Sequence, residues 1–166
     1  DFGLAMVVQP LAADDLVGHA MIADTIRTPI GLDESVTTPL QAEMALELKS
    51  CRYLCITPGR VGGLTPAAAI DRLCGEAGCF AWLGAVPQTA VGMRAGLALA
   101  SKDPFAYPAD YLPPEQLLAE DVAPPPELIL EDGVRKVRLW SEPGIGVEPD
   151  AALLEKYCVR QIKLPR

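Results

Sequence analysis

Short apolar runs alternate with longer stretches of helical period over the first two thirds of this chain. The apolar runs have strand length and lie at residues 4–8, 30–32, 53–56, 81–83 and 105–111. The stretches between them carry apolar residues at helical spacing, at residues 14–27, 39–49, 65–76 and 86–100. Strands that are apolar throughout and joined by helices are typical of a parallel sheet covered on both faces. The predicted fold class is therefore α/β, as a partial (β/α) barrel of the TIM type.

The pattern changes after residue 111. Residues 112–150 hold seven of the 16 prolines, three of them consecutive at 124–126. An Asp-Gly turn at 132–133 predicts a hairpin between residues 128–130 and 136–140, and residues 150–157 have the pattern of a short helix. We therefore predict two regions: residues 1–111 form the barrel part, and residues 112–166 form a proline-rich C-terminal extension that packs back on it.

Charge and composition exclude several classes of partner. Acidic residues outnumber basic ones 22 to 14, which gives a net charge of −8 and disfavours nucleic acids and anionic membrane surfaces as partners. The sequence lacks both an apolar run long enough to span a bilayer and the start of a secretory signal, so we expect a cytoplasmic protein. The five cysteines match neither a disulfide framework nor a Cys-x-x-Cys site, and we interpret them as reduced, mostly buried thiols.

The chain begins at Asp1, without a methionine, and continues directly into an apolar stretch. We interpret this start as that of a fragment of a longer protein. Five strands of an eight-stranded barrel would leave two open edges and an unfilled interior. The expected partners are therefore a second copy of the chain, in a homo-oligomer, or a missing N-terminal half.

Polar residues directly follow several predicted strands. Gln9 follows the first run, Asp33 and Glu34 follow the second, and Thr57 follows the third. In parallel strand–helix proteins the chemistry gathers at the carboxyl ends of the strands, so these side chains are the first candidates for a site. Two interpretations of the adjacent carboxylates stay open: ligands for a hard cation such as Mg²⁺, or residues that cap the next helix.

A glycine-rich segment, Pro-Gly-Arg-Val-Gly-Gly, follows the third strand at residues 58–63. We expect a loop there, which could either bind an anion through backbone N–H groups or make a tight strand–helix turn. The single histidine, His19, lies inside a predicted helix and away from the strand ends. A nucleophile activated by histidine therefore has little support.

Three motifs carry a resemblance to a known family. They are Gln-Pro-Leu at 9–11, Thr-Pro-Ile-Gly-Leu-Asp-Glu-Ser at 28–35 and Pro-Gly-Arg-Val-Gly-Gly-Leu at 58–64. In this order they resemble the C-terminal barrel domain of the enolase superfamily, and most of all the group of o-succinylbenzoate synthases and N-acylamino acid racemases. The resemblance covers nearly the whole chain. It implies that residues 1–111 correspond to about strands four to eight of the barrel, its C-terminal half.

The resemblance implies a particular chemistry. In that family, carboxylates at the ends of the third, fourth and fifth strands hold Mg²⁺, and lysines on the second and sixth strands move the α-proton of a small-molecule carboxylate. A proton next to a carboxylate is very weakly acidic, so the intermediate needs a cation and the lysine must be desolvated. The outcome is either a lyase reaction, dehydration to o-succinylbenzoate in menaquinone biosynthesis, or an isomerase reaction, racemisation.

Carried over position by position, the match is incomplete. Asp33 stands at the fifth-strand metal ligand, but Val8 replaces the fourth-strand glutamate and Thr57 replaces the sixth-strand lysine. Gln88 stands where a seventh-strand glutamate is usual, and the resemblance makes Gln88, Gly59 and Arg60 candidate substrate-binding residues. The first prediction is an enzyme of this group that is impaired in metal binding and proton abstraction. The alternative is a non-catalytic relative with a role in binding or assembly.

Overall fold

The computed structural model describes residues 2–102, 105 and 107–162, which divide into two compact units. The first comprises Asp1–Val86 and Gly96–Tyr111, and the second comprises Pro87–Ala95 and Leu112–Arg166. The division of the chain into residues 1–111 and 112–166 stays a prediction, because the helix at Ala90–Ala100 contributes to both units.

The helices and strands follow in the order β1 (Val7–Val8), α1 (Leu16–Ala23), β2 (Ile30–Leu32), α2 (Pro39–Glu47), β3 (Tyr53–Ile56), α3 (Pro58–Val61), α4 (Leu64–Ala77), β4 (Phe80–Leu83), α5 (Ala90–Ala100), η1 (Pro114–Gln116), β5 (Glu127–Glu131), β6 (Val134–Arg138) and α6 (Ala151–Tyr157).

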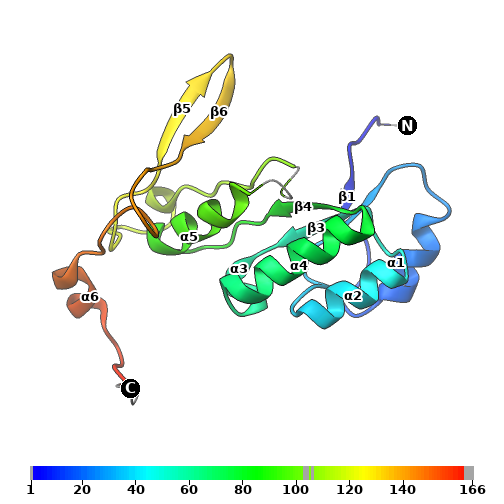
Figure 1. The fold of residues 1–166 in the computed structure, drawn as a ribbon, viewed down its shortest axis with the longest axis horizontal. Coiled ribbons are helices and arrows are strands. Elements are labelled where there is room, and N and C mark those ends of the chain that lie inside the picture. Colours follow the sequence, from blue (N-terminus) through cyan, green and yellow to red (C-terminus); the bar gives the residue numbers. More distant parts are fainter. Residues whose placement is uncertain (1, 103–104, 106, 163–166) are drawn as a thin grey trace. The chain divides into compact units, whose positions relative to one another are not determined.

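The first unit contains a four-stranded sheet in the order β1-β2-β3-β4. Every neighbouring pair is parallel, and the helices between the strands lie along the sheet (Figure 1). This is the predicted α/β arrangement of a partial barrel. Strands occupy four of the five predicted runs because uninterrupted apolar residues suit parallel strands that are covered on both faces.

The fifth predicted strand, at residues 105–111, is wrong. A single parallel bridge joins Phe105 to Ala81, and the rest of the described segment is irregular. Pro108 has no N–H to donate to a neighbouring strand, which explains why the bridge does not extend into a ladder there. Residue 106 lies outside the described part of the chain.

The core of the first unit lies on the helix-covered face of the sheet. Strand residues that alternate along β2, β3 and β4 pack there against small side chains of α2 and α4, and the fully buried members include Ile30, Leu32, Leu54, Ile56, Ala42, Ala45, Ala67 and Ile70. Since successive strand residues point to opposite faces, Gly31, Cys55 and Trp82 face the other side. A Cβ on Gly31 would lie 3.1 Å from the Trp82 ring and 3.2 Å from the Met6 sulfur.

The second unit contains the predicted hairpin. β5 and β6 pair antiparallel, and Asp132 and Gly133 form the turn with φ of 51° and 76°. Two successive positive φ values give a turn whose twist matches that of the strands. The predicted final helix is α6, whose first turn is capped by the Asp150 carboxylate. In the parts of the chain that the structure describes, no helix has the length and apolarity needed to cross a membrane.

Asp71 on α4 is a buried carboxylate with one oxygen, Oδ1, that lacks a hydrogen-bond partner among the described residues. Burial raises its pKa, and the charge of Lys102 opposes this only in part. A carboxyl group whose pKa is raised in the folded state keeps its proton to higher pH than in the unfolded state. Its contribution to stability is therefore largest in acid and declines as the pH rises through the unfolded and then the folded pKa.

We expect Asp71→Asn to be more stable than the parent at pH 7, by about 1 kcal/mol, because no charge has to be buried. The advantage should shrink at pH 3.5. Urea unfolding at the two pH values measures it, with Asp14→Asn on the exposed surface as the control. An advantage that is equal at both pH values would contradict the explanation by burial of charge.

Candidate functional site

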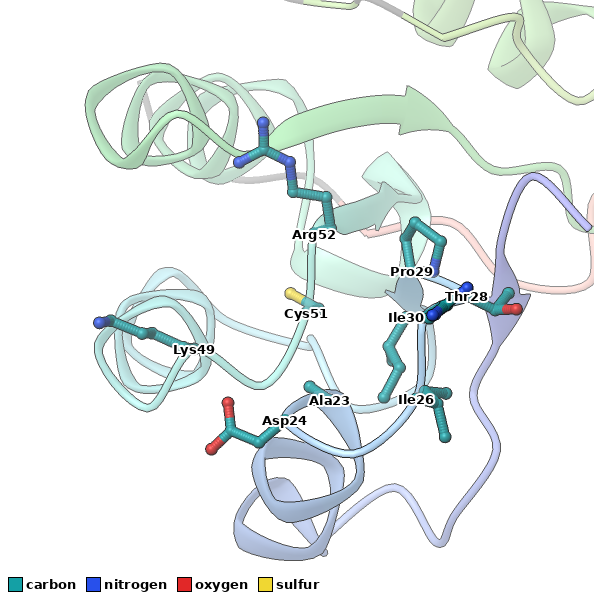
Figure 2. Close-up of a pocket in the computed structure, with 10 residues that line it drawn as sticks. Ala23, Asp24, Ile26, Thr28, Pro29, Ile30, Lys49, Cys51 and Arg52 are labelled. Atoms are coloured by element: carbon teal, nitrogen blue, oxygen red, sulfur yellow. The ribbon is translucent and has the colours of Figure 1, made fainter.

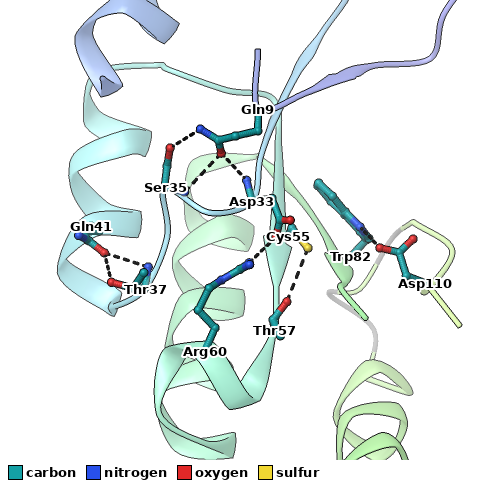
Figure 3. A network of polar contacts seen from close by, with 10 residues as sticks. All are labelled: Gln9, Asp33, Ser35, Thr37, Gln41, Cys55, Thr57, Arg60, Trp82 and Asp110. Atoms are coloured by element: carbon teal, nitrogen blue, oxygen red, sulfur yellow. Dashed lines mark hydrogen bonds and ion pairs between the residues drawn. The ribbon is translucent and has the colours of Figure 1, made fainter. Parts of the chain in front are cut away.

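The carboxyl ends of the four parallel strands bring the residues that follow them to one edge of the sheet. Gln9 follows β1, Asp33 follows β2, Thr57 follows β3 and Gly84 follows β4. Gln9, Asp33 and Thr57 were singled out from the sequence because they follow predicted strands. Figure 3 shows their side chains together with those of Ser35, Cys55 and Arg60.

Gln9 connects β1 to the loop after β2. Its Oε1 accepts hydrogen bonds from the backbone N–H of Asp33 at 3.0 Å and of Ser35 at 3.3 Å. Its Nε2 donates to the Ser35 hydroxyl at 2.8 Å and to the Leu11 carbonyl at 3.2 Å. These four contacts stabilise a backbone with a φ of 47°, which is unfavourable for glutamine. Gln9 therefore positions the loop that carries Asp33.

His19 stabilises the segment between β1 and α1. It is fully buried on α1, its Nδ1 lies 2.6 Å from the Asp15 carbonyl oxygen, and its Nε2 accepts from the Leu11 N–H at 3.3 Å. A ring whose two nitrogens are both engaged with backbone groups is a packing residue.

The Asp33 carboxylate forms an ion pair with the Arg60 guanidinium. Arg60 reaches this carboxylate from α3. The Arg60 side chain is 20% exposed and the Asp33 side chain is 26% exposed, so the pair is partly shielded from water. The Cys55 thiol on β3 lies against the same carboxylate, and burial together with the hydrogen bond to Asp33 raises the pKa of Cys55. The carboxylate thus has a cation on one side and a neutral thiol on the other.

Thr57 is buried at the end of β3, at only 3% exposure. Its hydroxyl lies 3.9 Å from the Cys55 sulfur, and its carbonyl accepts the N–H groups of Arg60 and Val61 that begin α3. The segment predicted as a loop from its glycines is therefore wrong at its start: Pro58–Val61 is a short helix with proline in its first turn, and it ends at Gly62 with a φ of 96°.

The other residues that the sequence singled out take no part in these contacts. Val8 ends β1 and is 45% exposed, with no oxygen to offer a cation. Gly59 lies on α3, and a Cβ built on it meets nothing within 4 Å. Gln88 belongs to the second unit, where its side chain lies against Gly92. Glu34 is exposed beside Asp33.

These residues do not fit a Mg²⁺ ion. A hard cation needs several oxygen ligands, and carboxylates are its usual protein ligands. Within the described residues, no group of three His, Cys, Asp or Glu side chains could hold a metal. Asp33 is the single carboxylate at its expected position, and Arg60 already neutralises it.

Gly84 allows β4 to approach β3 at this edge. A Cβ on Gly84 would lie 2.3 Å from the Cys55 sulfur and 2.5 Å from the Thr57 hydroxyl oxygen. We expect Gly84→Ala to destabilise the protein by about 1–3 kcal/mol, because these buried side chains must move. Urea unfolding of Gly84→Ala measures the loss. Gly59→Ala, where the space is open, is the matched control, and Cys55→Ala should recover part of the loss when combined with Gly84→Ala.

Parallel strands with intervening helices, and polar residues gathered at their carboxyl ends, define an α/β-barrel type of domain. The chain belongs to the enolase C-terminal domain-like family, whose model matches residues 1–153. This confirms the family resemblance that the three sequence motifs indicated.

Similar proteins come from several bacteria. The chain is 40% identical to the o-succinylbenzoate synthase of Geobacillus kaustophilus, over 95% of this chain and 41% of the relative. It is 35% identical to an N-succinylamino acid racemase of Amycolatopsis sp., over 97% of this chain and 43% of the relative. A solved enolase superfamily member from Listeria innocua superposes with a TM-score of 0.78 at 33% identity, covering 93% of this chain and 41% of that one. The chain thus spans about two fifths of the length of these relatives.

Proposed function

We propose that this chain is the C-terminal barrel part of a protein of the o-succinylbenzoate synthase and N-acylamino acid racemase group, in which α-proton abstraction and Mg²⁺ binding are impaired. The observation that carries the proposal is the Asp33–Arg60 ion pair beside a buried Thr57. At this edge the Asp33 carboxylate, the proposed metal ligand, is paired with a cation of the protein itself, and the proposed position of the base holds a neutral hydroxyl.

The chemistry explains why these side chains matter. Removing a proton next to a carboxylate places a second negative charge on the substrate, so the reaction needs a base and a nearby cation. A threonine hydroxyl cannot take up the proton near neutral pH. The Arg60 guanidinium already neutralises Asp33, so a substrate carboxylate bound to Arg60 would have to share this one cation with a second anion.

Substrate binding is the part of the family's function that this edge can still support. Gly59 leaves open space on α3, and Arg60 carries a fork of donors suited to a carboxylate. Arg60 Nε is buried and has no hydrogen-bond partner in the described part of the chain. We therefore propose that a small carboxylate binds against Gly59 and Arg60 on α3.

Solvent exchange of the substrate's α-proton tests the proposal. The protein is incubated with an N-succinylamino acid and Mg²⁺ in D₂O, and the α-proton signal is followed by NMR. We expect no exchange above the rate without protein, while the N-succinylamino acid racemase of Amycolatopsis sp. serves as the reference enzyme under the same conditions. Exchange at a rate comparable to that of the reference would overturn the proposal.

The second candidate function is a non-catalytic role in binding or assembly. Its support is the face of the sheet opposite the helices, where Tyr53, Phe80 and Tyr107 form an aromatic cluster with ring centroids 5.5 Å apart in each contacting pair. Phe80 and Tyr107 are about one third exposed. We propose that an N-terminal half or a second copy covers this face. The intact mass of the protein from its native source distinguishes these two occupants. A chain that includes an N-terminal half would exceed 17.7 kDa, whereas a second copy would leave the mass of each chain at that value.

A further inference from the structure

Cys51 meets Cys74 and Cys79 at the end of the sheet opposite the candidate site. Cys51 precedes β3, Cys74 lies in the last turn of α4, and Cys79 precedes β4. Cys51 and Cys79 line the same cavity, and the Cys79 N–H donates to the Cys74 carbonyl at 2.9 Å, so the three cysteines lie together. All three are free cysteines, and none contributes to the proposed function. We refer to Cys51, Cys74 and Cys79 as the thiol cluster.

The end of α4 brings two of these thiols together. Gly78 takes a left-handed conformation with a φ of 65°, the Gly78 N–H donates to the Gly75 carbonyl at 3.2 Å, and the Cys79 N–H donates to the Cys74 carbonyl at 2.9 Å. This pair of bonds is the Schellman motif, in which the residue after the glycine returns to contact the last turn of the helix. The backbone therefore positions Cys79 against Cys74.

Hydrogen bonds and charge favour ionisation at Cys79. The interactions of Cys79 with the thiols of Cys51 and Cys74, together with the charge of the Arg52 guanidinium, lower the pKa of Cys79. The pKa values of Cys51 and Cys74 are raised by their interaction with Cys79 and by burial. Cys79 is therefore the first of the three to form a thiolate, which is the reactive form of cysteine.

Two neighbouring cavities give small molecules access to the cluster. One, of about 330 Å³, is lined by Cys51 and Cys79 together with Lys49 and Arg52. The other, of about 360 Å³, also reaches Cys51 and is shown in Figure 2, where Lys49, Cys51 and Arg52 lie along one segment before β3. Both cavities are larger than a peroxide molecule, and cationic side chains at their walls favour a thiolate.

We propose that the thiol cluster is an oxidation site at which a hydroperoxide converts Cys79 and one flanking thiol into an intramolecular disulfide. The Cys79 thiolate attacks one peroxide oxygen, so that an S–O bond forms and the O–O bond breaks. The other oxygen leaves with the bonding electrons and takes a proton, giving water or an alcohol. The thiol sulfur of Cys51 or Cys74 then attacks the Cys79 sulfur, the S–O bond breaks, and the departing hydroxyl group takes up the proton of that thiol to leave as water.

The test is oxidation of the protein by hydrogen peroxide, stopped by alkylation of the remaining thiols and read by mass spectrometry. We expect a loss of two hydrogens and one cross-linked peptide pair that contains Cys79. The disulfide should form about tenfold or more faster than Cys158 is oxidised, although Cys158 is exposed and Cys79 is 8% exposed. Oxidation that follows exposure, with Cys158 modified first and no disulfide at Cys79, would overturn the proposal.

Single variants keep the test specific. Cys79→Ser should abolish the rapid disulfide, and Cys158→Ser should leave it unchanged. Cys55 is buried like Cys79 but contacts Asp33 and Thr57 instead of another thiol, so Cys55→Ser is the matched control and should also leave the rate unchanged. Circular dichroism verifies that each variant is folded. A rapid disulfide that persists in folded Cys79→Ser would contradict the role assigned to Cys79.

Discussion

Val8→Glu combined with Thr57→Lys should raise both the affinity for Mg²⁺ and the rate of α-proton exchange with solvent. Val8 ends β1 and Thr57 follows β3. Strand β2 lies between these two strands, and Asp33 directly follows β2. A glutamate at position 8 would add a second carboxylate to the edge, and a lysine at position 57 would supply a base. Since one general base typically contributes about 10²–10⁴-fold, we expect exchange to rise at least 100-fold over the parent.

The ion pair at Asp33 limits how much the metal gains. Mg²⁺ must displace the Arg60 guanidinium from the carboxylate before Asp33 can serve as a ligand. A second negative charge at position 8 compensates for this by attracting the ion, so the increase in affinity should depend on Val8→Glu more than on Thr57→Lys. Arg60→Gln, added to the double variant, should raise the affinity further because it leaves Asp33 free.

The measurement uses the longest form of the protein that contains this chain, because the chain spans about two fifths of its relatives. Titration calorimetry gives the Mg²⁺ affinity, and NMR in D₂O gives the exchange rate of an N-succinylamino acid. Val8→Gln with Thr57→Met is the control of similar size without the new charges. No gain over this control would mean that positions 8 and 57 do not correspond to the family's ligand and base.

The strands were predictable because their apolar runs are uninterrupted. Residues 30–32 and 53–56 are strands over the predicted lengths, and β4 begins one residue before the predicted 81–83. The run at 105–111 misled because Phe105 and two tyrosines resemble a strand, while Pro108 lacks the N–H that a continuing ladder requires. The helix α3 was missed because four residues are too few to show a helical period.

The position of the candidate site was predictable, but its contacts were not. Strand ends meet at one edge of a parallel sheet, so Gln9, Asp33 and Thr57 could be placed there from the sequence. The Asp33–Arg60 pair depends on the direction in which the first turn of α3 projects Arg60, and this follows only from the fold. The alternation of β3 did carry one signal, because Cys55 and Thr57 are two residues apart and share a face.

The thiol cluster shows a signal that sequence analysis passed over. The spacing of Cys51, Cys74 and Cys79 fits no metal or disulfide motif, and it predicts only reduced, mostly buried thiols. Gly78, directly before Cys79 and near the end of a predicted helix, was the available indication. A glycine at that place commonly closes a helix and returns the next residue to the last turn, which would have placed Cys79 near Cys74. The contact with Cys51 depends on the pairing of β3 with β4.

Arg94→Ala should destabilise the second unit by about 2–4 kcal/mol. Arg94 is 8% exposed, and its guanidinium donates to the carbonyls of Pro124 at 3.0 Å, Pro125 at 3.2 Å and Ile145 at 3.2 Å. Its Cζ also lies 4.8 Å from the centre of the Trp140 ring. One side chain thus joins two segments that have no regular secondary structure, and hydrogen bonds from a charged donor are among the stronger ones in proteins.

Arg138→Ala is the matched control, because it removes the same side chain within the same unit. Arg138 is 62% exposed on β6 and makes one ion pair, with Glu127 at 3.4 Å, so its loss should cost less than about 1 kcal/mol. Amide hydrogen exchange at Val122, Ala123 and the non-proline residues of 140–147 reads the effect next to these contacts, and we expect it to accelerate in Arg94→Ala alone. Equal protection of these segments in the two variants would mean that the proline-rich segment is held by contacts other than those of Arg94.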